Sequence, residues 1–345
     1  MQGFWETLPR PFFVLAPLAN VTDAAFRRLI AKYGKPDVTW TEFVSADGLV
    51  LADEEGKRKL LRDLVFTEAE RPIVAQFFTS NPEHMEKVAA LASELGFDGI
   101  DINMGCPDKS IEKQGAGAKL ITNPERAAEV IRAAKRGAPH LPVSVKTRLG
   151  YNKDVLEEWL PVLLKEEPAA ITIHARTRKE MSKVPARWER VKRAVEIRNE
   201  MGSKTLIIGN GDVLDIEDAK KKAAETGADG VMLGRAIFGT PWLFTNVRKV
   251  RPQQDPVAEP ATSEGLAQAF RPDQFLSIEE KLRIAVEHTK LFEELLGDLK
   301  SFAIMKKHFK AYVEGFDGAK DLRMKLMEAN SAAEVAHIID EFLKG

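Results

Sequence analysis

The sequence predicts an α/β protein, a TIM (β/α)₈ barrel followed by a small all-α helical domain. Up to about residue 250, short β-rich runs alternate with amphipathic helical runs, and the β-rich runs number eight. Eight strands alternating with helices is the number that closes a parallel barrel. The open doubly wound sheet is the rival fold, but no GxGxxG motif follows a strand in this chain. The barrel is therefore the better prediction.

The predicted strands are short runs rich in apolar and β-branched residues. They are FFVLAP (12–17), VTWTEF (38–43), IVAQFF (73–78), GIDINMG (99–105), VSVKTRL (143–149), AITIHAR (170–176), TLIIGNG (205–211) and GVMLGR (230–235). Several helices between them have recognisable starts. Asn81 and Asn123 each precede a proline at the first helical position, and Asp215 opens a third helix. These starts place helices between successive strands, as a barrel requires.

The chain divides into a barrel, a connecting segment and a helical end. We expect a catalytic barrel over residues 1–250. Residues 251–273 lose the periodicity and gather Pro, Gln, Ser and Ala, which is typical of a linker or long loop. Residues 274–345 form the second domain, and from 277 onward they contain no convincing strand and resemble about four helices, 278–296, 301–316, 319–328 and one that Ser331 caps.

Composition excludes several classes of protein. The chain has 345 residues, 44% of them hydrophobic and 30% charged, which suits a globular protein with a sizeable core. Its single cysteine excludes an intramolecular disulfide and suits a cytoplasmic protein. No signal peptide and no apolar run long enough to span a membrane is evident. We expect no metal, no membrane partner and a monomer. The net charge of −1 means that a polyanion must bind to a local patch.

Polar side chains interrupt several predicted strands. Strands of a parallel barrel are covered on both faces, so polar residues within them are informative. In the fifth strand Lys146 and Arg148 alternate with apolar residues, Asn103 and His174 do the same in the fourth and sixth, and Gln76 comes late in the third. Function sits at the carboxyl ends of barrel strands. These side chains predict a polar cofactor or substrate at the barrel mouth.

Glycines follow the last two strands. The seventh strand ends in Gly209-Asn210-Gly211-Asp212 and the eighth in Gly234-Arg235. Glycines let backbone N–H groups approach an anion, and barrel phosphate sites favour the loops after strands seven and eight. A phosphate at this edge and a polar ring over the mouth fit FMN.

Six motifs in order resemble the tRNA-dihydrouridine synthases. They are APLANVTD (16–23), DINMGCP (101–107), VSVKTRLG (143–150), HARTRKE (174–180), IIGNGDV (207–213) and GVMLGRAIFGTPW (230–242). The helical end, with KKHFKAYVEG (306–315) and AKDLRMKL (319–326), looks like that family's RNA-binding domain. The resemblance covers essentially the whole chain. It departs from the family pattern in KEMSKVPARW (179–188), where an aromatic and glycine run is usual, and at Lys306, where arginine is common.

The resemblance implies an oxidoreductase that reduces a uridine of tRNA with FMN, which NADPH re-reduces. It implies that FMN contacts Ala16, Pro17, Leu18, Gln76, Lys146, His174, Asn210, Gly211, Asp212, Gly234 and Arg235. It also implies that Asn103 contacts the uracil and that Cys106, on a mobile loop, is the proton donor. The sequence leaves open which uridine is modified and whether NADPH is preferred over NADH.

The chemistry of the reaction agrees with a cysteine acid. Addition of a hydride to C6 of uracil leaves negative charge at C5 and O4, so C5 needs a proton. An ordinary thiol, with a pKa of about 8.5, is still protonated at neutral pH and can donate it. Lys109 and Lys113 lie close in sequence and are expected to act against this role if they lower the pKa of Cys106.

Basic residues gather in the helical end. Between residues 300 and 325 seven are positive, including Lys300, and three are negative. Lys306 and Lys310 are one helical turn apart and share a face. Such a face suits RNA phosphates, although solvated lysines on helices are common. The expected tRNA contacts besides Asn103 are Arg176, Arg178, Lys306, Lys307, Lys310 and Arg323.

Three alternatives remain open. A barrel enzyme using FMN on a free pyrimidine, like a dihydroorotate dehydrogenase, needs no basic helical domain, so deletion of residues 274–345 would leave its turnover intact. A lyase using Lys146 as a Schiff base would be colourless. A non-catalytic RNA-binding protein with this fold would tolerate loss of the Cys106 thiol.

Overall fold

The structure is a computed structural model that describes residues 2–245 and 276–344. It confirms a parallel eight-stranded sheet in the order β1-β8-β7-β6-β5-β4-β3-β2. Backbone N–H groups of Asp37 and Leu15 donate to the carbonyl oxygens of Phe13 (2.9 Å) and Val38 (3.4 Å), which joins the two outer strands and closes the barrel. The strands are β1 (Phe12–Leu15), β2 (Thr39–Ser45), β3 (Ile73–Phe78), β4 (Gly99–Met104), β5 (Val143–Arg148), β6 (Ala170–His174), β7 (Leu206–Asn210) and β8 (Gly230–Leu233).

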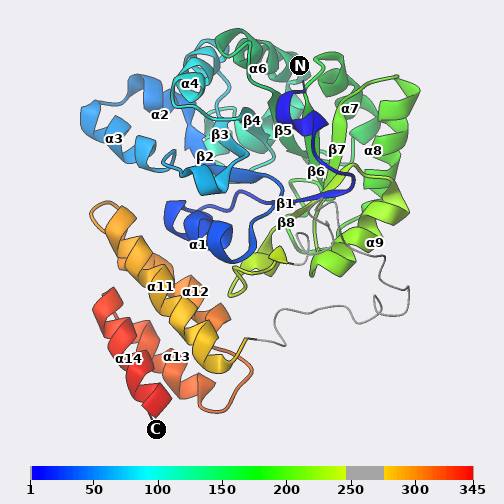
Figure 1. Cartoon of the computed structure of the whole chain (residues 1–345). Helices are drawn as coiled ribbons and strands as arrows, with labels where there is room; N and C mark the ends of the chain where they lie inside the picture. The colour runs from blue at the N-terminus through cyan, green and yellow to red at the C-terminus, as the bar shows by residue number, and fades with distance from the viewer. Residues whose placement is uncertain (1, 246–275, 345) are drawn as a thin grey trace, which may run out of the picture.

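The helices of the barrel lie outside the sheet (Figure 1). They are α1 (Ala24–Gly34), α2 (Ala46–Leu51), α3 (Glu54–Arg62), α4 (Pro82–Glu94), α5 (Lys109–Lys113), α6 (Pro124–Gly137), α7 (Leu156–Lys165), α8 (Trp188–Glu200) and α9 (Ile216–Thr226). Short 3₁₀ helices are η1 (Gly3–Glu6), η2 (Glu68–Glu70), η3 (Gly117–Thr122) and η4 (Arg235–Ile237). The predicted caps are confirmed, because the side chains of Asn81, Asn123 and Asp215 accept hydrogen bonds from the first turns of α4, α6 and α9.

Four helices follow in the second described range: α11 (Ile278–Leu296), α12 (Lys306–Tyr312), α13 (Ala319–Glu328) and α14 (Ala332–Lys344). The helix expected over 301–316 differs from the prediction. It is a 3₁₀ turn, η6 (Phe302–Met305), followed by α12, and it ends before Gly315, whose φ of +80° belongs to a turn. The predicted linker 251–273 lies outside the described residues, so the domain division there stays a prediction.

Three aromatic side chains fill the barrel at the end away from the strand carboxyl termini. Trp5, which precedes the first strand, is fully buried and packs against Phe12 (ring centroids 5.6 Å apart) and Trp40 (5.8 Å apart). Val14, Val74, Ile208 and other residues join them in one apolar cluster inside the barrel. With this end filled, a cavity is possible only at the other end.

The helical end shares a hydrophobic core with the barrel. Phe26 of α1 is fully buried and stacks on His288 of α11, with ring centroids 4.7 Å apart, while His308 of α12 approaches its edge at the same distance. One apolar cluster contains residues of β1, α1 and β8 together with residues of α11 to α14. Figure 1 shows α11 and α12 beside α1, with α13 and α14 farther from the barrel.

Candidate functional site

A cavity of about 830 Å³ opens at the carboxyl ends of the barrel strands. It brings together fourteen of the residues predicted from the sequence, although these lie on seven different strands or the loops that follow them. They are Ala16, Pro17, Leu18, Gln76, Asn103, Cys106, Lys146, His174, Arg176, Asn210, Gly211, Asp212, Gly234 and Arg235. The strand register explains the grouping, since Asn103 pairs with Lys146 and His174 with Asn210 across neighbouring strands.

The loop after β4 holds Cys106 at the cavity wall. The side-chain oxygen of Asn103 accepts hydrogen bonds from the backbone N–H groups of Gly105 (3.1 Å) and Cys106 (2.9 Å). The carbonyl oxygen of Cys106 in turn accepts from the N–H of Ala118 (2.9 Å). A side chain at Gly117 would lie 2.7 Å from that carbonyl oxygen, so only glycine permits the contact. The backbone of Cys106 is thus held through both its N–H and its carbonyl group.

Burial raises the pKa of the Cys106 thiol above its ordinary value. A hydrogen bond from the Asp108 backbone opposes this shift, as do the charges of Lys146 and Arg148, while the carboxylate charge of Asp108 adds to it; burial prevails. Lys109 and Lys113 do not bring this pKa below its ordinary value, so the condition under which they would act against an acid role is not met. Both lie on α5, and the positive charges that reach the thiol come instead from β5. A thiol with a raised pKa stays protonated at neutral pH and is suited to donate a proton.

Lys146 projects from β5 into the cavity, and its ammonium group lies 3.4 Å from the side-chain oxygen of Asn210. Burial and the positive charge of Arg148 lower the pKa of Lys146 to about 8, so its charge is present at neutral pH. His174 differs, because burial and the same cationic neighbours lower the pKa of its imidazole well below 6.5. The guanidinium of Arg176 lies 3.2 Å from Nε2 of His174. Since a guanidinium only donates, Nε2 is the acceptor and the ring proton is on Nδ1.

The loops after β7 and β8 form the opposite edge of the cavity. Gly211 has a φ of +125°, and a Cβ there would lie 2.8 Å from the Cβ of Ala186, so another residue does not fit. The Nε1–H of Trp188 donates to the Gly211 carbonyl oxygen (2.8 Å) and fixes this turn. At Gly234 a built Cβ would lie 3.7 Å from the Cβ of Ala16, an ordinary van der Waals distance. With glycine at both positions, no side chain covers the backbone N–H groups, which allows an anionic group to approach them closely.

Asp212 is held by two arginines. Its carboxylate pairs with Arg176 and with Arg235 (2.7 Å), and it accepts the backbone N–H of Ala186 (2.9 Å). The hydrogen bond from Arg176 keeps the pKa of Asp212 below its ordinary value, so the carboxylate is ionised. An ionised carboxylate repels a phosphate. Asp212 therefore fits a phosphate site by orienting Arg235 and through its backbone.

Comparison with known proteins identifies the family. A family profile for dihydrouridine synthase (Dus) matches residues 14–344. The curated "Probable tRNA-dihydrouridine synthase 2" of Bacillus subtilis is 40% identical over 343 residues, which cover 99% of this chain and 97% of that protein. A "Probable tRNA-dihydrouridine synthase" of Staphylococcus epidermidis is 38% identical over 343 residues, covering 99% and 96%. The chain belongs to the dihydrouridine synthase family.

Solved structures agree with the fold. A 2-naphthoyl-CoA reductase matches with a TM-score of 0.50 and 14% identity, covering 70% of this chain and 50% of the other. The 6-hydroxypseudooxynicotine amine oxidase of Pseudomonas geniculata matches with a TM-score of 0.51 and 13% identity, covering 70% and 47%. The chain spans about half the length of these proteins, and at this identity the likeness concerns the barrel fold alone.

Two arginines expected to contact RNA already have carboxylate partners in this chain. Arg176 is 2% exposed, and besides its pair with Asp212 it donates to the carbonyl oxygen of Val184 (2.6 Å). Arg178 pairs with Glu112 through two nitrogens and lies over the ring of Tyr151. Arg176 lines the cavity but presents little surface to solvent. Both side chains hold the loop after β6 in place, and an RNA contact by either stays a prediction.

The basic residues of the helical end lie away from the cavity lining. Lys307 and Lys310 of α12 are exposed, while Lys306 is half-buried. Arg323 of α13 is also half-buried and donates to the carbonyl oxygen of Val313 (3.2 Å). Lys300 does not belong to a free basic face, because its ammonium group pairs with Glu42 and Asp63 of the barrel. The predicted cluster is thus smaller than the sequence count suggests.

Sequence reasoning assigned no role to Arg148, which lines the cavity and is 8% exposed. Its Nε donates to the Gly105 carbonyl oxygen (2.7 Å), and Nη1 donates to the carbonyl oxygens of Thr177 (3.2 Å) and Met181 (3.3 Å). Arg148 therefore ties the loop that carries Cys106 to the loop after β6. The alternation of β5 placed it beside Lys146 on one face, but only the fold shows which carbonyl groups it meets.

No helix within residues 2–245 or 276–344 is long and apolar enough to cross a membrane. Over the same two ranges, no group of three or more His, Cys, Asp or Glu side chains is arranged to hold a metal ion.

Proposed function

We propose that this protein reduces the C5=C6 bond of a uridine in tRNA, with FMN as its cofactor, NADPH as the reductant and Cys106 as the proton donor. The carrying observation is the Cys106 thiol, whose pKa burial raises, at the wall of a cavity that also holds Lys146, Gln76 and a glycine-rich edge. A cysteine whose pKa is raised is a poor nucleophile and a competent acid at neutral pH. This separates the site from those in which cysteine attacks a substrate.

The residues of the cavity fit FMN from end to end. At one edge the turns at Gly211 and Gly234 keep their backbone free of side chains, and Arg235 supplies positive charge for a phosphate. Gln76, Lys146 and neutral His174 supply donors and charge for a polar ring toward the middle. Ala16, Pro17 and Leu18 supply an apolar wall. When bound, FMN would supply the hydride that is added to C6 of the uracil.

The chain then has to protonate C5. In the proposed step the S–H bond of Cys106 breaks, a C5–H bond forms, and the electron pair of the S–H bond remains on sulfur. The positive charges of Lys146 and Arg148, which act on the thiol, stabilise the thiolate that results. Asn103 is nearly buried, and one N–H of its amide remains to face a uracil carbonyl oxygen. The uridine must leave its stack to reach this point, which costs a few kcal/mol.

We propose that the helical end binds the tRNA backbone, because Lys307 and Lys310 are exposed on α12. Phosphate contacts of this kind position a folded RNA without reading its sequence. A cytoplasmic location and a monomeric state accompany this proposal. The single cysteine is consistent with a reducing compartment.

The deciding experiment is anaerobic. The purified protein is reduced with NADPH, and the flavin absorbance is followed after addition of an unmodified tRNA transcript or, separately, orotate. Reoxidation by the tRNA alone is the expected result. Reoxidation by orotate alone would indicate an enzyme that acts on a free pyrimidine. A folded protein with no flavin band would favour the Schiff-base alternative at Lys146, which borohydride trapping would then test.

Replacement of the thiol tests the proton donor. We expect Cys106→Ala to bind FMN and to be reduced by NADPH as the wild type is, while its single-turnover rate on tRNA falls by about 10² to 10³, which is typical for loss of a general acid. Cys106→Ser is the matched control, since a hydroxyl is a weaker acid than a thiol but fills similar space. Unchanged turnover in the alanine variant would exclude Cys106 as the donor.

A further inference from the structure

Below the floor of the cavity, a chain of hydrogen bonds connects a buried carboxylate to the loop that carries Cys106. Asp101 of β4 is fully buried and does not line the cavity. Its Oδ2 accepts from Nε2 of Gln76 (2.6 Å), and Oε1 of Gln76 accepts from Nδ2 of Asn103 (3.1 Å). Oδ1 of Asn103 then accepts from the backbone N–H groups of Gly105 and Cys106.

The two ends of this chain determine the direction of every hydrogen bond in it. At one end the backbone N–H groups of Gly105 and Cys106 only donate, so the Asn103 atom facing them must be its oxygen. Its amide nitrogen therefore faces Gln76, and the Gln76 atom that meets it must be an oxygen. The nitrogen of Gln76 is left to face Asp101, which accepts because it is a carboxylate. Neither amide can turn over without setting donor against donor.

Ser144 secures the other oxygen of the carboxylate. Its hydroxyl donates to Oδ1 of Asp101 (2.5 Å), and it also lies 3.3 Å from the carbonyl oxygen of Ile100. Gln76, Asp101 and Ser144 occupy the same level of three adjacent strands, because Asp101 pairs with both of the others in the register of the sheet. The carboxylate is therefore held by residues of the neighbouring strands on both sides. Their hydrogen bonds offset the free-energy cost of burying its charge.

We propose that Asp101 is a positioning residue, which fixes the orientation of the Gln76 and Asn103 amides and, through Asn103, the loop that carries Cys106. In this orientation each amide keeps one N–H directed away from the chain of hydrogen bonds, and both side chains line the cavity. The site thus presents donors, not acceptors, to the carbonyl oxygens of a pyrimidine or a flavin ring. This consequence for ligands rests on the proposed function, whereas the effect on the loop does not.

The chain's single cysteine makes the loop directly measurable. Alkylation by iodoacetamide reports on Cys106 alone and needs no cofactor or tRNA. In Asp101→Leu the Gln76 nitrogen loses its acceptor, and the orientation of the Gln76 and Asn103 amides is no longer fixed from that end. We expect this to destabilise the closed position of the Cys106 loop by about the free energy of one hydrogen bond. We expect the alkylation rate to rise about fivefold at constant pH, the effect of one net hydrogen bond. Asp101→Ala, which adds no bulk, replaces the leucine variant if that variant does not fold.

Two further variants separate positioning from general loosening. Asp101→Asn should keep an alkylation rate within twofold of the wild type, because its oxygen can still accept from Gln76 while its nitrogen donates to Ser144, whose hydroxyl turns to Ile100. Thr172→Val removes another buried polar group from the barrel interior, a hydroxyl with no hydrogen-bond partner among the described residues. It should also leave the rate within twofold. Circular dichroism and thermal unfolding confirm that each variant is folded.

An unchanged alkylation rate in a folded Asp101→Leu or Asp101→Ala variant would overturn the proposal. Equal acceleration in Thr172→Val would also overturn it, since the effect would then be one of general loosening. If the wild type does not reduce tRNA but the alkylation pattern holds, the proposed function fails and the positioning role stands. If tRNA is reduced but the alkylation pattern is absent, the positioning role fails alone.

Discussion

Lys146 shows how the surroundings of one residue decide what its charge can do. The side chain is partly open to the cavity, yet protein atoms surround it closely enough that burial, with Arg148, lowers its pKa to about 8. Asp101 and Cys106 act in the opposite direction. A lysine with a lowered pKa that is still charged at neutral pH is suited to bind an anionic ligand. The negative charge of the ligand then raises the pKa of the ammonium group and stabilises its charged form.

This lowered pKa predicts a pH-dependent stability. In the unfolded chain the pKa of Lys146 returns to about 10.5, so between pH 8 and pH 10.5 the unfolded state binds more protons than the folded state. The cost of the buried charge is full below pH 8 and is relieved as the pH rises through this window. We expect cofactor-free Lys146→Met to be about 2 kcal/mol more stable than the wild type at pH 7, with a margin that shrinks toward pH 10.5.

Urea unfolding of the two proteins at several pH values measures this margin. Lys307→Met, which changes an exposed lysine, serves as the control and should show a small, constant difference. A margin for Lys146→Met that stays constant from pH 7 to pH 10.5 would contradict the lowered pKa. Much of this residue's placement was predictable, since the alternation of β5 put Lys146 at the barrel mouth. Its pKa was not, because that depends mainly on how deeply the folded chain buries the side chain.

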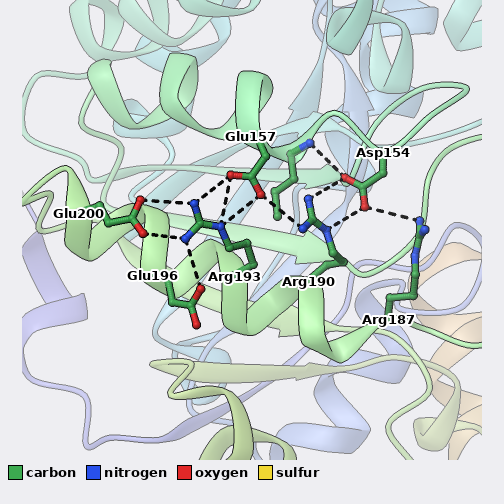
Figure 2. Close-up of polar contacts among 8 residues, drawn as sticks. Asp154, Glu157, Arg187, Arg190, Arg193, Glu196 and Glu200 are labelled. Atoms are coloured by element: carbon green, nitrogen blue, oxygen red, sulfur yellow. Dashed lines mark hydrogen bonds and ion pairs between the residues drawn. The ribbon is translucent and has the colours of Figure 1, made fainter.

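At the scale of elements, an ion-pair network fastens α8 to the first turn of α7 and to the loop that precedes α7 (Figure 2). Arg187, Arg190 and Arg193 are spaced three residues apart and lie along one side of the helix. Arg190 binds Asp154 through two nitrogens (2.9 and 3.1 Å), and Arg193 binds Glu157 (3.0 Å). A second group of acids, Glu196 and Glu200, completes the network on α8 itself.

The network extends to the rim of the cavity. Arg187 donates to Glu180 (3.0 Å), whose carboxylate accepts the backbone N–H of Thr177 (2.6 Å). The loop over 177–187 contains most of KEMSKVPARW (179–188), the stretch that departs from the usual family pattern. The loop is held by these pairs and by Arg148 and Arg176. The sequence does not reveal this arrangement, because Arg190 and Arg193 each lie 36 residues from their partners Asp154 and Glu157 in the chain.

Removal of one guanidinium measures the network. Arg190→Met should lower the free energy of unfolding by about 1 kcal/mol at low ionic strength, since the pair with Asp154 is bidentate but partly exposed. Most of that loss should vanish in about 1 M salt, where the Debye length is about 3 Å. Lys221→Met is the control, because Lys221 and Glu225 are exposed and 3.9 Å apart. Equal losses at both salt concentrations would show that Arg190 acts through packing.

On the scale of the whole molecule, the helical end is fastened to the barrel beside the cavity. Lys300, in the segment after α11, is 17% exposed and pairs with Asp63 (2.7 Å) and Glu42 (2.8 Å). Burial opposes its charge, but Glu42 and Asp63 outweigh burial and raise the pKa of Lys300. Glu42 also accepts the backbone N–H of Asn20, close to the cavity wall at 16–19. The position of the helices is thus tied to the cavity.

Lys300→Met tests this connection. It leaves two carboxylates facing each other at a largely buried junction, and we expect a loss of about 2 kcal/mol in the free energy of unfolding. Lys310→Met, an exposed change on α12, should cost less than about 0.5 kcal/mol. Urea unfolding followed by tryptophan fluorescence measures both. Equal effects of the two substitutions would show that the junction does not depend on Lys300.

The core that the helical end shares with the barrel also changes which experiment can distinguish a tRNA-reducing enzyme from a free-pyrimidine enzyme. Deletion of residues 274–345 was expected to leave a free-pyrimidine enzyme active. In the structure that deletion would expose Phe26 and the rest of the apolar cluster that α1 shares with α11 and α12. The truncated barrel should therefore aggregate whatever its substrate. Reversal of charge at Lys307 and Lys310 is the better test, because both are exposed.

The sequence alone determined the barrel, its eight strands, most helix starts and the set of residues at the cavity. These depend on local patterns, namely alternation in strands, caps before helices and glycines after strands, which the chain carries at short range. Tertiary structure decided the rest. Which carboxylate pairs with Arg176, Arg178 or Lys300, why Cys106 keeps its proton, and how Asp101 orients two amides all depend on burial and on neighbours distant in the chain. Burial and Coulomb interactions are set by distance in space, and only the folded chain defines that distance.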